Sequence, residues 1–197
     1  MFSGIILERA KVEEVKNDGV GRKFWLNVPM AFHRRIKKGA SVALNGACFT
    51  VLQKSLRAFE VEAMPQTLRL TTAGDWVEGD LLNFEPSLRV GDELGGHFVF
   101  GHVDEVCQVD RCLFEGTSTV MCVRASQGVM AMIAPRGSIA IDGVSLTVVS
   151  CKETSFRVSL LPETLRATTL GKLKSGSKVN LEIDMLARYA YEFLHKN

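Results

Sequence analysis

The amino-acid sequence predicts an all-β protein made of two tandem, similar small β-barrels followed by a C-terminal α-helix. Three observations predict this fold class: an internal repeat, a hairpin signal in each copy, and a helical pattern confined to the end of the chain. Residues 40–85 return as residues 137–182 without a gap, at a constant offset of 97, with 17 identical residues among the 46 aligned. Each copy is long enough to bury its own core. We therefore expect barrels at residues 1–97 and 98–184, and a helix at residues 185–197.

The chain opens with an apolar stretch, residues 1–6, that is cut short by Glu8 and Arg9. This stretch is too brief for an export signal or a membrane-spanning segment. We expect it to form a first strand. The offset also lays Gly4 on Gly101, so the repeat extends beyond its best-matched part.

Each copy contains a tight hairpin signal followed by a strand signal. β-rich runs flank Asn45-Gly46 in the first copy and Asp142-Gly143 in the second. Such dipeptides suit the positive φ angles of a two-residue turn. Residues 59–63 then alternate apolar side chains with glutamates, which predicts a strand with one buried and one wet face. Many short strands separated by glycine-bearing turns favour a closed barrel in each half.

The helical signal lies at the end of the chain. From Met185 to Leu194 the apolar residues recur near a 3.6-residue period, and Asp184 precedes them as a candidate N-cap. This tail lies outside the repeat. We expect it to cover apolar surface, either on its own barrel or by self-association.

Composition excludes several classes of partner. The chain is 46% hydrophobic and 23% charged with a net charge of +2, so no strong field calls for nucleic acid or an anionic membrane. The densest basic run, Arg34, Arg35, Lys37 and Lys38, is more typical of a solvent-exposed face than of a phosphate-binding patch. The five cysteines form no CxxC pair, which favours the reducing cytoplasm.

The usual site motifs are missing from the sequence. It contains no GxGxxG, GxxxxGK[ST] or GxSxG pattern, so it predicts no Rossmann site, P-loop or hydrolase elbow. His97 and His102 lack a third ligand at metal-binding spacing, and each is typical of a structural histidine. What remains is a pair of matched segments, Cys48 to Thr50 and Ser145 to Thr147, each followed by a Pro-x-Thr-Leu-Arg run.

At these segments the chain resembles the riboflavin synthase family, whose members carry two lumazine-binding barrels. The matching runs are MFSGII, NGACFTV, MPQTLRLTT, GGHFVFGHVD, IDGVSLTV, LPETLRATTLG and VNLEIDMLARY. The resemblance implies a dismutation of two 6,7-dimethyl-8-ribityllumazine molecules. One molecule gives a four-carbon unit to the other, and the products are riboflavin and 5-amino-6-(D-ribitylamino)uracil. The resemblance implies neither a metal nor an organic cofactor.

The resemblance also implies an assembly. Family members are homotrimers in which the first barrel of one subunit faces the second barrel of its neighbour, with the C-terminal helices at the centre. Some members associate with lumazine synthase. We expect the same trimer here, because paired related pockets can bring two identical substrates together in a reactive orientation.

The substrate-binding residues that the resemblance implies fall into two sets, one for each copy. The first comprises Gly4, Ile5, Ile6, Cys48, Phe49, Thr50, Glu62, Ala63, Met64, Pro65, Gln66 and Thr67. The second comprises Gly101, His102, Val103, Arg136, Ser145, Leu146, Thr147, Leu161, Pro162, Glu163, Thr164, Leu165 and Arg166. Backbone groups of these segments suit the dione edge of the ring, and hydroxyls suit the ribityl chain. We interpret the repeated Asn83, Asn180, Arg69 and Arg166 as structural.

Six residues are candidates for catalysis. We expect His102, with Thr147 or Ser145 nearby, to transfer the proton of the 7-methyl group. Either Cys48 or a water held by Ser41 is the candidate nucleophile, and Cys48 as a small core residue is the alternative. The last candidate, Asp184, is expected to orient a partner across the subunit interface.

A few positions depart from the family pattern. Gln66 replaces a glutamate common in the first copy, while Phe100 and Glu105 stand where small residues are common. Two other classes of protein remain alternatives. One is a non-catalytic lumazine or flavin antenna, which the intact GGHFVFGH and SLT runs disfavour. The other is a tandem-barrel interaction module without a small ligand.

Overall fold

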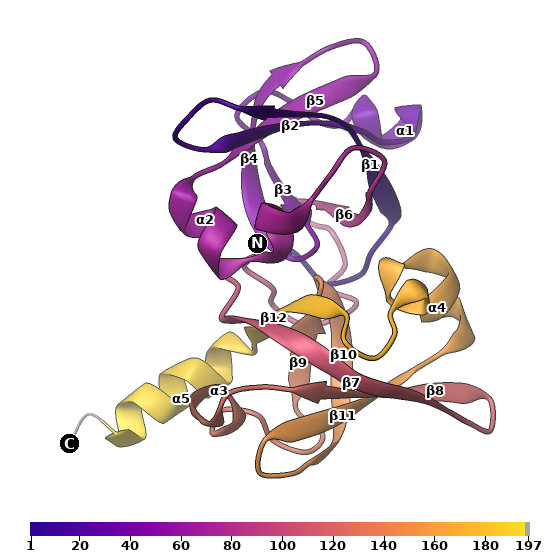
Figure 1. The fold of residues 1–197 in the computed structure, drawn as a ribbon, viewed down its shortest axis with the longest axis vertical. Coiled ribbons are helices and arrows are strands. Elements are labelled where there is room, and N and C mark those ends of the chain that lie inside the picture. Colours follow the sequence, from indigo (N-terminus) through magenta and orange to yellow (C-terminus); the bar gives the residue numbers. More distant parts are fainter. Residues whose placement is uncertain (196–197) are drawn as a thin grey trace.

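Two closed antiparallel barrels lie one above the other in the computed structural model, which describes residues 1–195 of the 197-residue chain (Figure 1). A C-terminal helix projects from the second barrel. The predicted fold class is therefore confirmed. The last two residues of the predicted helix lie outside the described residues.

The first barrel has the strand order β1-β2-β5-β4-β3-β6, and pairing of β1 with β6 closes it. A short helix before β3 and a helical turn before β6 span the barrel's ends. Its elements are β1 (Glu8–Asn17), β2 (Arg22–Asn27), α1 (Met30–His33), β3 (Ser41–Leu44), β4 (Ala47–Lys54), β5 (Ala58–Ala63), α2 (Pro65–Leu70), η1 (Thr72–Asp75) and β6 (Leu81–Pro86).

The second barrel repeats this topology, with β7-β8-β11-β10-β9-β12 closed by pairing of β12 with β7. Its helices fall at the offset of the sequence repeat. Its elements are β7 (Glu105–Glu115), β8 (Ser118–Arg124), α3 (Gln127–Met130), β9 (Ser138–Ile141), β10 (Val144–Cys151), β11 (Ser155–Leu160), α4 (Pro162–Ala167), η2 (Thr169–Lys172), β12 (Lys178–Ile183) and then α5 (Met185–His195).

Each barrel is filled by its own apolar core. Phe24, Phe59 and Phe84 are fully buried in the first, and Phe156 is the corresponding large aromatic in the second. Burial of such side chains is the main stabilising term of each barrel. The sequence predicts that the glutamates of β5 face solvent, and this is wrong for Glu60. Its side chain is only 6% exposed, because Trp25 and Gln53 flank it on the neighbouring strands.

The predicted turns and helix start are confirmed, but the predicted first strand is not. Asn45 and Asp142 have φ angles of 43° and 45°, each followed by a glycine with positive φ, as a two-residue hairpin turn requires. The Asp184 carboxylate accepts a hydrogen bond from the Leu186 N–H at 2.9 Å and so caps α5. The opening residues contribute only an isolated bridge at Phe2, and the first strand begins at Glu8.

Asn83 joins the first barrel to the second. Its side chain is fully buried, accepts a hydrogen bond from the Thr169 N–H at 2.8 Å and donates one to the Asp142 carbonyl at 2.9 Å. Both partners belong to the second copy. A buried amide with its donor and acceptor both used fixes the relative position of the two barrels.

Asn180, the repeat equivalent of Asn83, makes the same pair of bonds in the opposite direction. It accepts from the Thr72 N–H at 2.8 Å and donates to the Asn45 carbonyl at 2.7 Å. The junction therefore has approximate two-fold symmetry. The structural role expected for both asparagines is confirmed.

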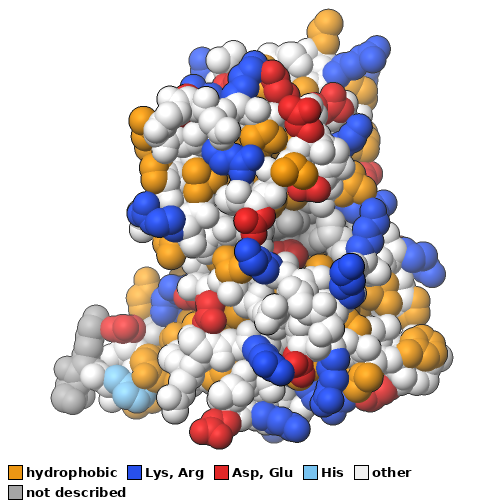
Figure 2. All heavy atoms as spheres, viewed as in Figure 1, with side chains coloured by type: hydrophobic (Ala, Val, Ile, Leu, Met, Phe, Trp, Pro, Cys, Tyr) orange, Lys and Arg blue, Asp and Glu red, His pale blue; other side chains and the backbone are white. Residues whose placement is uncertain are grey.

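The surface carries charges of both signs. Figure 2 shows basic and acidic side chains interspersed over both barrels on the face that it presents. This mixture agrees with the small net charge of +2. Among the described residues, no helix is long and apolar enough to cross a membrane.

Candidate functional site

Two short segments run between the barrels and pair with each other. We name them the bridging segments: residues 2–5 at the start of the chain and residues 99–102 in the connection between the copies. Phe2 and Val99 exchange two backbone hydrogen bonds, of 2.7 Å and 3.1 Å. The bridging segments therefore meet near the two-fold axis that relates the copies.

The first bridging segment is held by the first barrel at one edge and the second barrel at the other. Glu85 on β6 accepts hydrogen bonds from the Ser3 N–H, the Ser3 hydroxyl and the Gly4 N–H, at 2.7 Å, 2.8 Å and 3.0 Å. Burial raises the pKa of Glu85, and the bonds from Ser3 and Gly4 oppose that rise. On the other edge, the Gly4 carbonyl accepts from the Ser145 N–H of β10 at 2.7 Å.

The second bridging segment repeats these contacts with the barrels exchanged. Glu182 on β12 accepts from the Phe100 and Gly101 N–H groups at 2.7 Å and 2.9 Å. The Gly101 carbonyl accepts from the Cys48 N–H of β4 at 3.0 Å. Each bridging segment is thus anchored on its own barrel by a glutamate. It lies against a strand of the other barrel, which is β10 at Ser145 for the first segment and β4 at Cys48 for the second.

This exchange corrects the expected grouping of the site residues. Gly4 lies beside Ser145 rather than Cys48, and Gly101 lies beside Cys48 rather than Ser145. The expected grouping treated each copy as self-contained. It is wrong because the backbone N–H and C=O groups of a bridging segment point to opposite barrels.

The exchanged contacts leave no room for a side chain on either glycine. Gly4 and Gly101 have φ angles of 75° and 78°, in the left-handed region that favours glycine. A Cβ on Gly4 would lie 2.6 Å from the Cβ of Ser145, and one on Gly101 would lie 2.5 Å from the Cβ of Cys48. Glycine is required at both positions for backbone to reach these strands.

The Cys48 site lies on the outer face of β4. Its members are Cys48, Thr50, residues 62–67 and residues 101–103. Val51 pairs with Val61, so the chain that leaves β5 towards α2 continues alongside Cys48 and Thr50. Ser41 pairs with Thr50 on the neighbouring strand. Phe49 lies between these residues but points into the core, so it offers the site only its backbone.

The Cys48 thiol is half-buried. Burial raises its pKa, and the adjoining Ser41 hydroxyl opposes this rise. The thiol is therefore protonated at neutral pH and acts as a weak hydrogen-bond donor rather than a thiolate. This property distinguishes Cys48 from an activated cysteine nucleophile.

The Ser145 site lies on the outer face of β10. Its members are Ser145, Thr147, residues 4–6, residues 161–166 and His97. Val148 pairs with Val158, so the chain between β11 and α4 continues alongside Ser145 and Thr147. Leu146, like Phe49, points into the core. The backbone N–H of Arg136, which has a φ of 69°, donates to the Val148 carbonyl at 2.7 Å and so places Arg136 beside this strand.

His97 is the imidazole that contacts Ser145. Its Nδ1 lies 2.7 Å from the Ser145 Oγ, while its buried Nε2 has no partner. Burial lowers the pKa of His97, and the charge of Asp184 opposes this shift. The neutral ring can therefore accept the hydroxyl proton, which is the arrangement of a serine activated by a base.

Sequence reasoning did not select His97 as a site residue. The sequence predicts that His102 acts with Ser145 or Thr147, yet the exposed His102 ring lies beside Phe100, with the ring centroids 6.0 Å apart and the planes tilted by 36°. The sequence feature that could have indicated His97 as a site residue is the Gly95-Gly96 pair directly before it. At Gly96 a Cβ would lie 2.7 Å from the Cβ of Ser145, so that backbone comes close to the site.

Exposed apolar side chains stand at equivalent places in the two sites. Met64 is 53% exposed and Leu161 is 63% exposed, each directly before the proline that begins α2 or α4. Such surfaces suit contact with a flat ring. The nearby Glu163 and Arg166 bond each other within α4.

The two sites are open rather than enclosed. The cavities of about 680 Å³ and about 430 Å³ beside the barrels are lined by neither Cys48 nor Ser145. Thr50 and Thr147 are exposed. Within residues 1–195 no group of three His, Cys, Asp or Glu side chains is placed to hold a metal ion.

Comparison with known proteins agrees with this architecture. The lumazine binding domain family matches the chain twice, at residues 3–87 and 100–184. Crystal structures of LumP share the fold at 22% identity: the complex with 6,7-dimethyl-8-(1'-D-ribityl) lumazine has a TM-score of 0.84 and covers 92% of this chain and 98% of that one. The complex with riboflavin has a TM-score of 0.86, covering 93% and 99%.

Sequence relatives cover almost the whole chain. The riboflavin synthase of Brucella abortus (strain 2308) is 44% identical over 198 residues, covering 96% of each protein. That of Bacillus subtilis (strain 168) is 34% identical, covering 100% of this chain and 91% of the relative. That of Escherichia coli (strain K12) is 37% identical, covering 93% and 87%. With two lumazine-binding domains and relatives of this similarity, the chain belongs to the riboflavin synthase family.

Proposed function

We propose that the protein is a riboflavin synthase, a transferase that dismutates two molecules of 6,7-dimethyl-8-ribityllumazine. A four-carbon unit passes from one molecule to the other, giving riboflavin and 5-amino-6-(D-ribitylamino)uracil. One observation carries this proposal: a chain of this family holds two related sites, each built from strands of one copy and a bridging segment of the other.

A reaction between two identical molecules suits such a pair of sites. The main obstacle is to bring both rings together in the correct orientation, and two matched sites remove much of that entropic barrier before the chemistry begins. Both sites offer the same kind of surface, with a backbone edge, a threonine hydroxyl and an exposed apolar side chain. The same ring can therefore bind in each.

The binding residues divide according to the bridging contacts. In the Cys48 site, backbone groups of β4 and of the second bridging segment pair with the ring, and Thr50 bonds the ribityl chain. The Ser145 site uses β10 and the first bridging segment, with Thr147 in the equivalent role. The remaining members are Gly4, Ile5, Ile6, Phe49, Glu62, Ala63, Met64, Pro65, Gln66, Thr67, Gly101, Val103, Arg136, Leu146, Leu161, Pro162, Glu163, Thr164, Leu165 and Arg166.

Proton transfer at the 7-methyl group is assigned to imidazoles and hydroxyls. His102, expected from the sequence to act with Ser145 or Thr147, is instead assigned as the base of the Cys48 site, because its neighbour Gly101 accepts from the Cys48 N–H. In the Ser145 site, His97 accepts the proton of the Ser145 hydroxyl at 2.7 Å, and Asp184 favours the imidazolium that results. Thr147 lies two residues along β10 and holds the substrate beside this pair.

The nucleophile that adds at C7 of the second ring is a water held by Ser41. Burial keeps the pKa of Cys48 raised, so its thiol is protonated and helps to position that water or the ring. The same argument makes Cys48 the less effective of the two candidates for nucleophile.

The homotrimer expected from the family would cover the two sites, which are open in a single chain. The sites are open, and a reaction through a carbanion needs water excluded. On α5 the exposed apolar residues Leu186, Tyr189, Phe193 and Leu194 are 67–78% exposed, a surface that suits burial between subunits. The first barrel of one subunit then closes the second barrel of its neighbour, with Asp184 near that interface.

The cellular context follows from the same proposal. Five free cysteines favour the reducing cytoplasm. The substrate is the product of lumazine synthase, so association with that enzyme would shorten its path. The proposed function involves neither a nucleic acid nor a membrane.

A non-catalytic lumazine-binding protein is the second candidate, because the LumP structures share the fold and bind lumazine or riboflavin. Their identity to this chain is 22%, however, while the synthases reach 44%. The Ser145–His97 contact also has a purpose in catalysis and none in simple binding.

Incubation of the purified protein with 6,7-dimethyl-8-ribityllumazine separates the candidates. We expect riboflavin and 5-amino-6-(D-ribitylamino)uracil to appear in equal amounts. Binding without conversion would support the antenna protein, and absence of binding would support the interaction module. In the same assay we expect His102→Gln and Ser145→Ala to lower kcat more than Cys48→Ser. Full activity of the His102 variant would remove that residue from proton transfer.

A further inference from the structure

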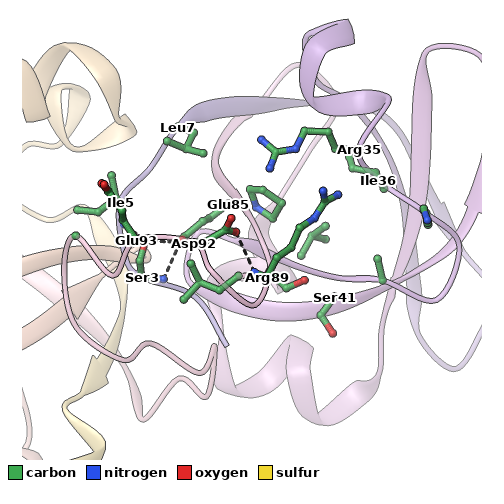
Figure 3. Close-up of a pocket in the computed structure, with 17 residues that line it drawn as sticks. Ser3, Ile5, Leu7, Arg35, Ile36, Ser41, Glu85, Arg89, Asp92 and Glu93 are labelled. Carbon is green, nitrogen blue, oxygen red and sulfur yellow. Dashed lines mark hydrogen bonds between the residues drawn. The ribbon is translucent and has the colours of Figure 1, made fainter.

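A cavity of about 680 Å³ lies beside the first barrel and adjoins the two sites through Ser41 and Ile5. Its walls are the first bridging segment, the loop between α1 and β3, and the chain that leaves β6 (Figure 3). Ser41 lines it, but Cys48 and Thr50 do not. We name this cavity the Arg35 pocket. Its volume lies within the range typical of small-molecule sites.

Three cationic side chains line the Arg35 pocket without an ion-pair partner. They are Arg35 and Lys37 from the loop after α1 and Arg89 from the chain after β6. Figure 3 shows the guanidinium groups of Arg35 and Arg89 directed into the space of the pocket. Elsewhere in residues 1–195 seven ion pairs form, yet none includes these three cations.

Two of the three carboxylates of the pocket are already engaged by backbone groups. Glu85 is buried and uses both of its oxygens on Ser3 and Gly4. The Asp92 carboxylate accepts from the Arg89 N–H at 2.9 Å. Glu93, the third carboxylate of the pocket, is exposed.

The repeat gives an internal comparison for these cations. By the offset of 97, the equivalents of Arg35 and Lys37 are Met132 and Ala134, whereas Arg89 lies in the connection after β6, where the second copy instead begins α5. The second copy keeps Glu182 and Ser138 in place of Glu85 and Ser41. The second barrel closes without cations at the positions of Arg35 and Lys37, so the fold does not require them there.

We propose that the Arg35 pocket binds a small phosphorylated molecule, with Arg35, Lys37 and Arg89 holding the phosphate. A phosphate monoester offers three terminal oxygens as hydrogen-bond acceptors, so it can contact all three cationic side chains at once, whereas a single carboxylate offers only two. Guanidinium groups also match phosphate oxygens in bidentate pairs. The walls formed by Ile5, Leu7 and Leu88 provide apolar contact for the organic part of the ligand.

Titration of the full-length protein with inorganic phosphate, followed by amide NMR shifts and by calorimetry, tests the proposal. We expect saturable binding with shifts at Ser3, Ile36 and Leu88. The variant Arg35→Met/Lys37→Ala/Arg89→Leu takes the second copy's residues at the first two positions and changes an exposed side chain at the third, so we expect it to fold. Its affinity should fall by about tenfold or more, because it removes all three charged contacts.

Arg34→Gln/Lys38→Gln is the matched control, since it removes exposed cations of the same loop that do not line the pocket. We expect it to change the affinity by less than about twofold, the size of a screened surface effect. Equal losses in the control and the triple variant would overturn the proposal. Absence of saturable binding to the wild-type protein would overturn it too. Both readouts are independent of turnover, so failure here leaves the proposed synthase activity standing.

Discussion

The two sites share a scaffold but differ at the reactive position. The Cys48 site presents a thiol beside the Ser41 hydroxyl, while the Ser145 site presents a hydroxyl beside the His97 imidazole. The glycines that admit the bridging segments, and the glutamates that anchor them, are the same in both. Under the proposed function, the repeat has kept the groups that hold the substrate and changed the groups that transfer the proton. Two identical substrates can therefore have different roles in one reaction.

The largest effect is expected from removing His97, the imidazole that contacts Ser145. We predict that His97→Gln lowers kcat by about 10²–10⁴-fold, the usual contribution of a positioned base, with little change in lumazine binding. Burial lowers the pKa of His97 from its ordinary 6.5, so the ring is neutral at neutral pH. The wild-type rate should fall once the pH drops below this lowered pKa, and the variant should lack that acid limb. Unchanged kcat would make the His97 contact structural.

The next effect concerns the bridging segments. We predict that Gly101→Ala destabilises the protein by about 3 kcal/mol in urea unfolding, because it combines a disfavoured positive φ with steric overlap. Its Cβ would lie 2.5 Å from that of Cys48. Gly79→Ala is the control: Gly79 has a φ of 93° but nothing lies within 4 Å of its Cβ. We expect a loss of about 1 kcal/mol there, from backbone strain alone.

A third experiment tests the symmetry of the junction. Asn83→Ala and Asn180→Ala each remove a buried amide that makes two hydrogen bonds across the barrels. We predict losses of about 2–3 kcal/mol for each, since two backbone groups are left unsatisfied. The two losses should be equal within error. A loss confined to one variant would show that the junction depends on one copy.

The smallest effect concerns the junction turns, where Asn45 of the first copy faces Asp142 of the second. Each accepts a backbone N–H, from Asn83 at 2.7 Å and from Asn180 at 2.8 Å. Burial raises the pKa of Asp142 from 3.8 to about 7. The contribution of its neutral form to stability is therefore complete below 3.8 and is lost as the pH rises through about 7.

We predict that Asp142→Asn removes this decline and raises the free energy of unfolding by about 2 kcal/mol at about pH 8. The amide keeps an oxygen for the Asn180 N–H, as Asn45 does in the first copy. Asn45→Asp is the converse variant and should introduce a second decline of the same sign. The difference between variant and wild type isolates Asp142 from Glu85, Glu182 and Asp104, whose pKa values burial also raises. A pH-independent difference would contradict the assignment.

Much of the fold could be predicted from the sequence because its signals are local. Hairpin turns at Asn45-Gly46 and Asp142-Gly143 require particular backbone angles, and the tail shows a helical period behind the Asp184 cap. The gapless offset then carries each element from one copy to the other. Two predictions from the sequence pattern were wrong because contacts between distant parts of the chain decided the structure there. Glu60 is covered by neighbouring strands, and the opening residues pair with Val99 instead of entering a barrel.

The site could be predicted only as a set of segments. The matched runs around Cys48 and Ser145 lie on equivalent strands, yet nothing in their order along the chain indicates which bridging segment covers which strand. That choice depends on the opposite directions of the N–H and C=O groups of Gly4 and Gly101. The His97 contact with Ser145 joins residues 48 positions apart and has no repeat equivalent, so the offset could not reveal it.

Because the bridging segments are exchanged, each half of the chain lacks a segment that covers one of its strands until the other half is present. During synthesis the first barrel emerges with the strand of Cys48 uncovered, and it stays so until residues 99–102 have left the ribosome. Because each half supplies the last piece of the other, heating should melt both in one cooperative step.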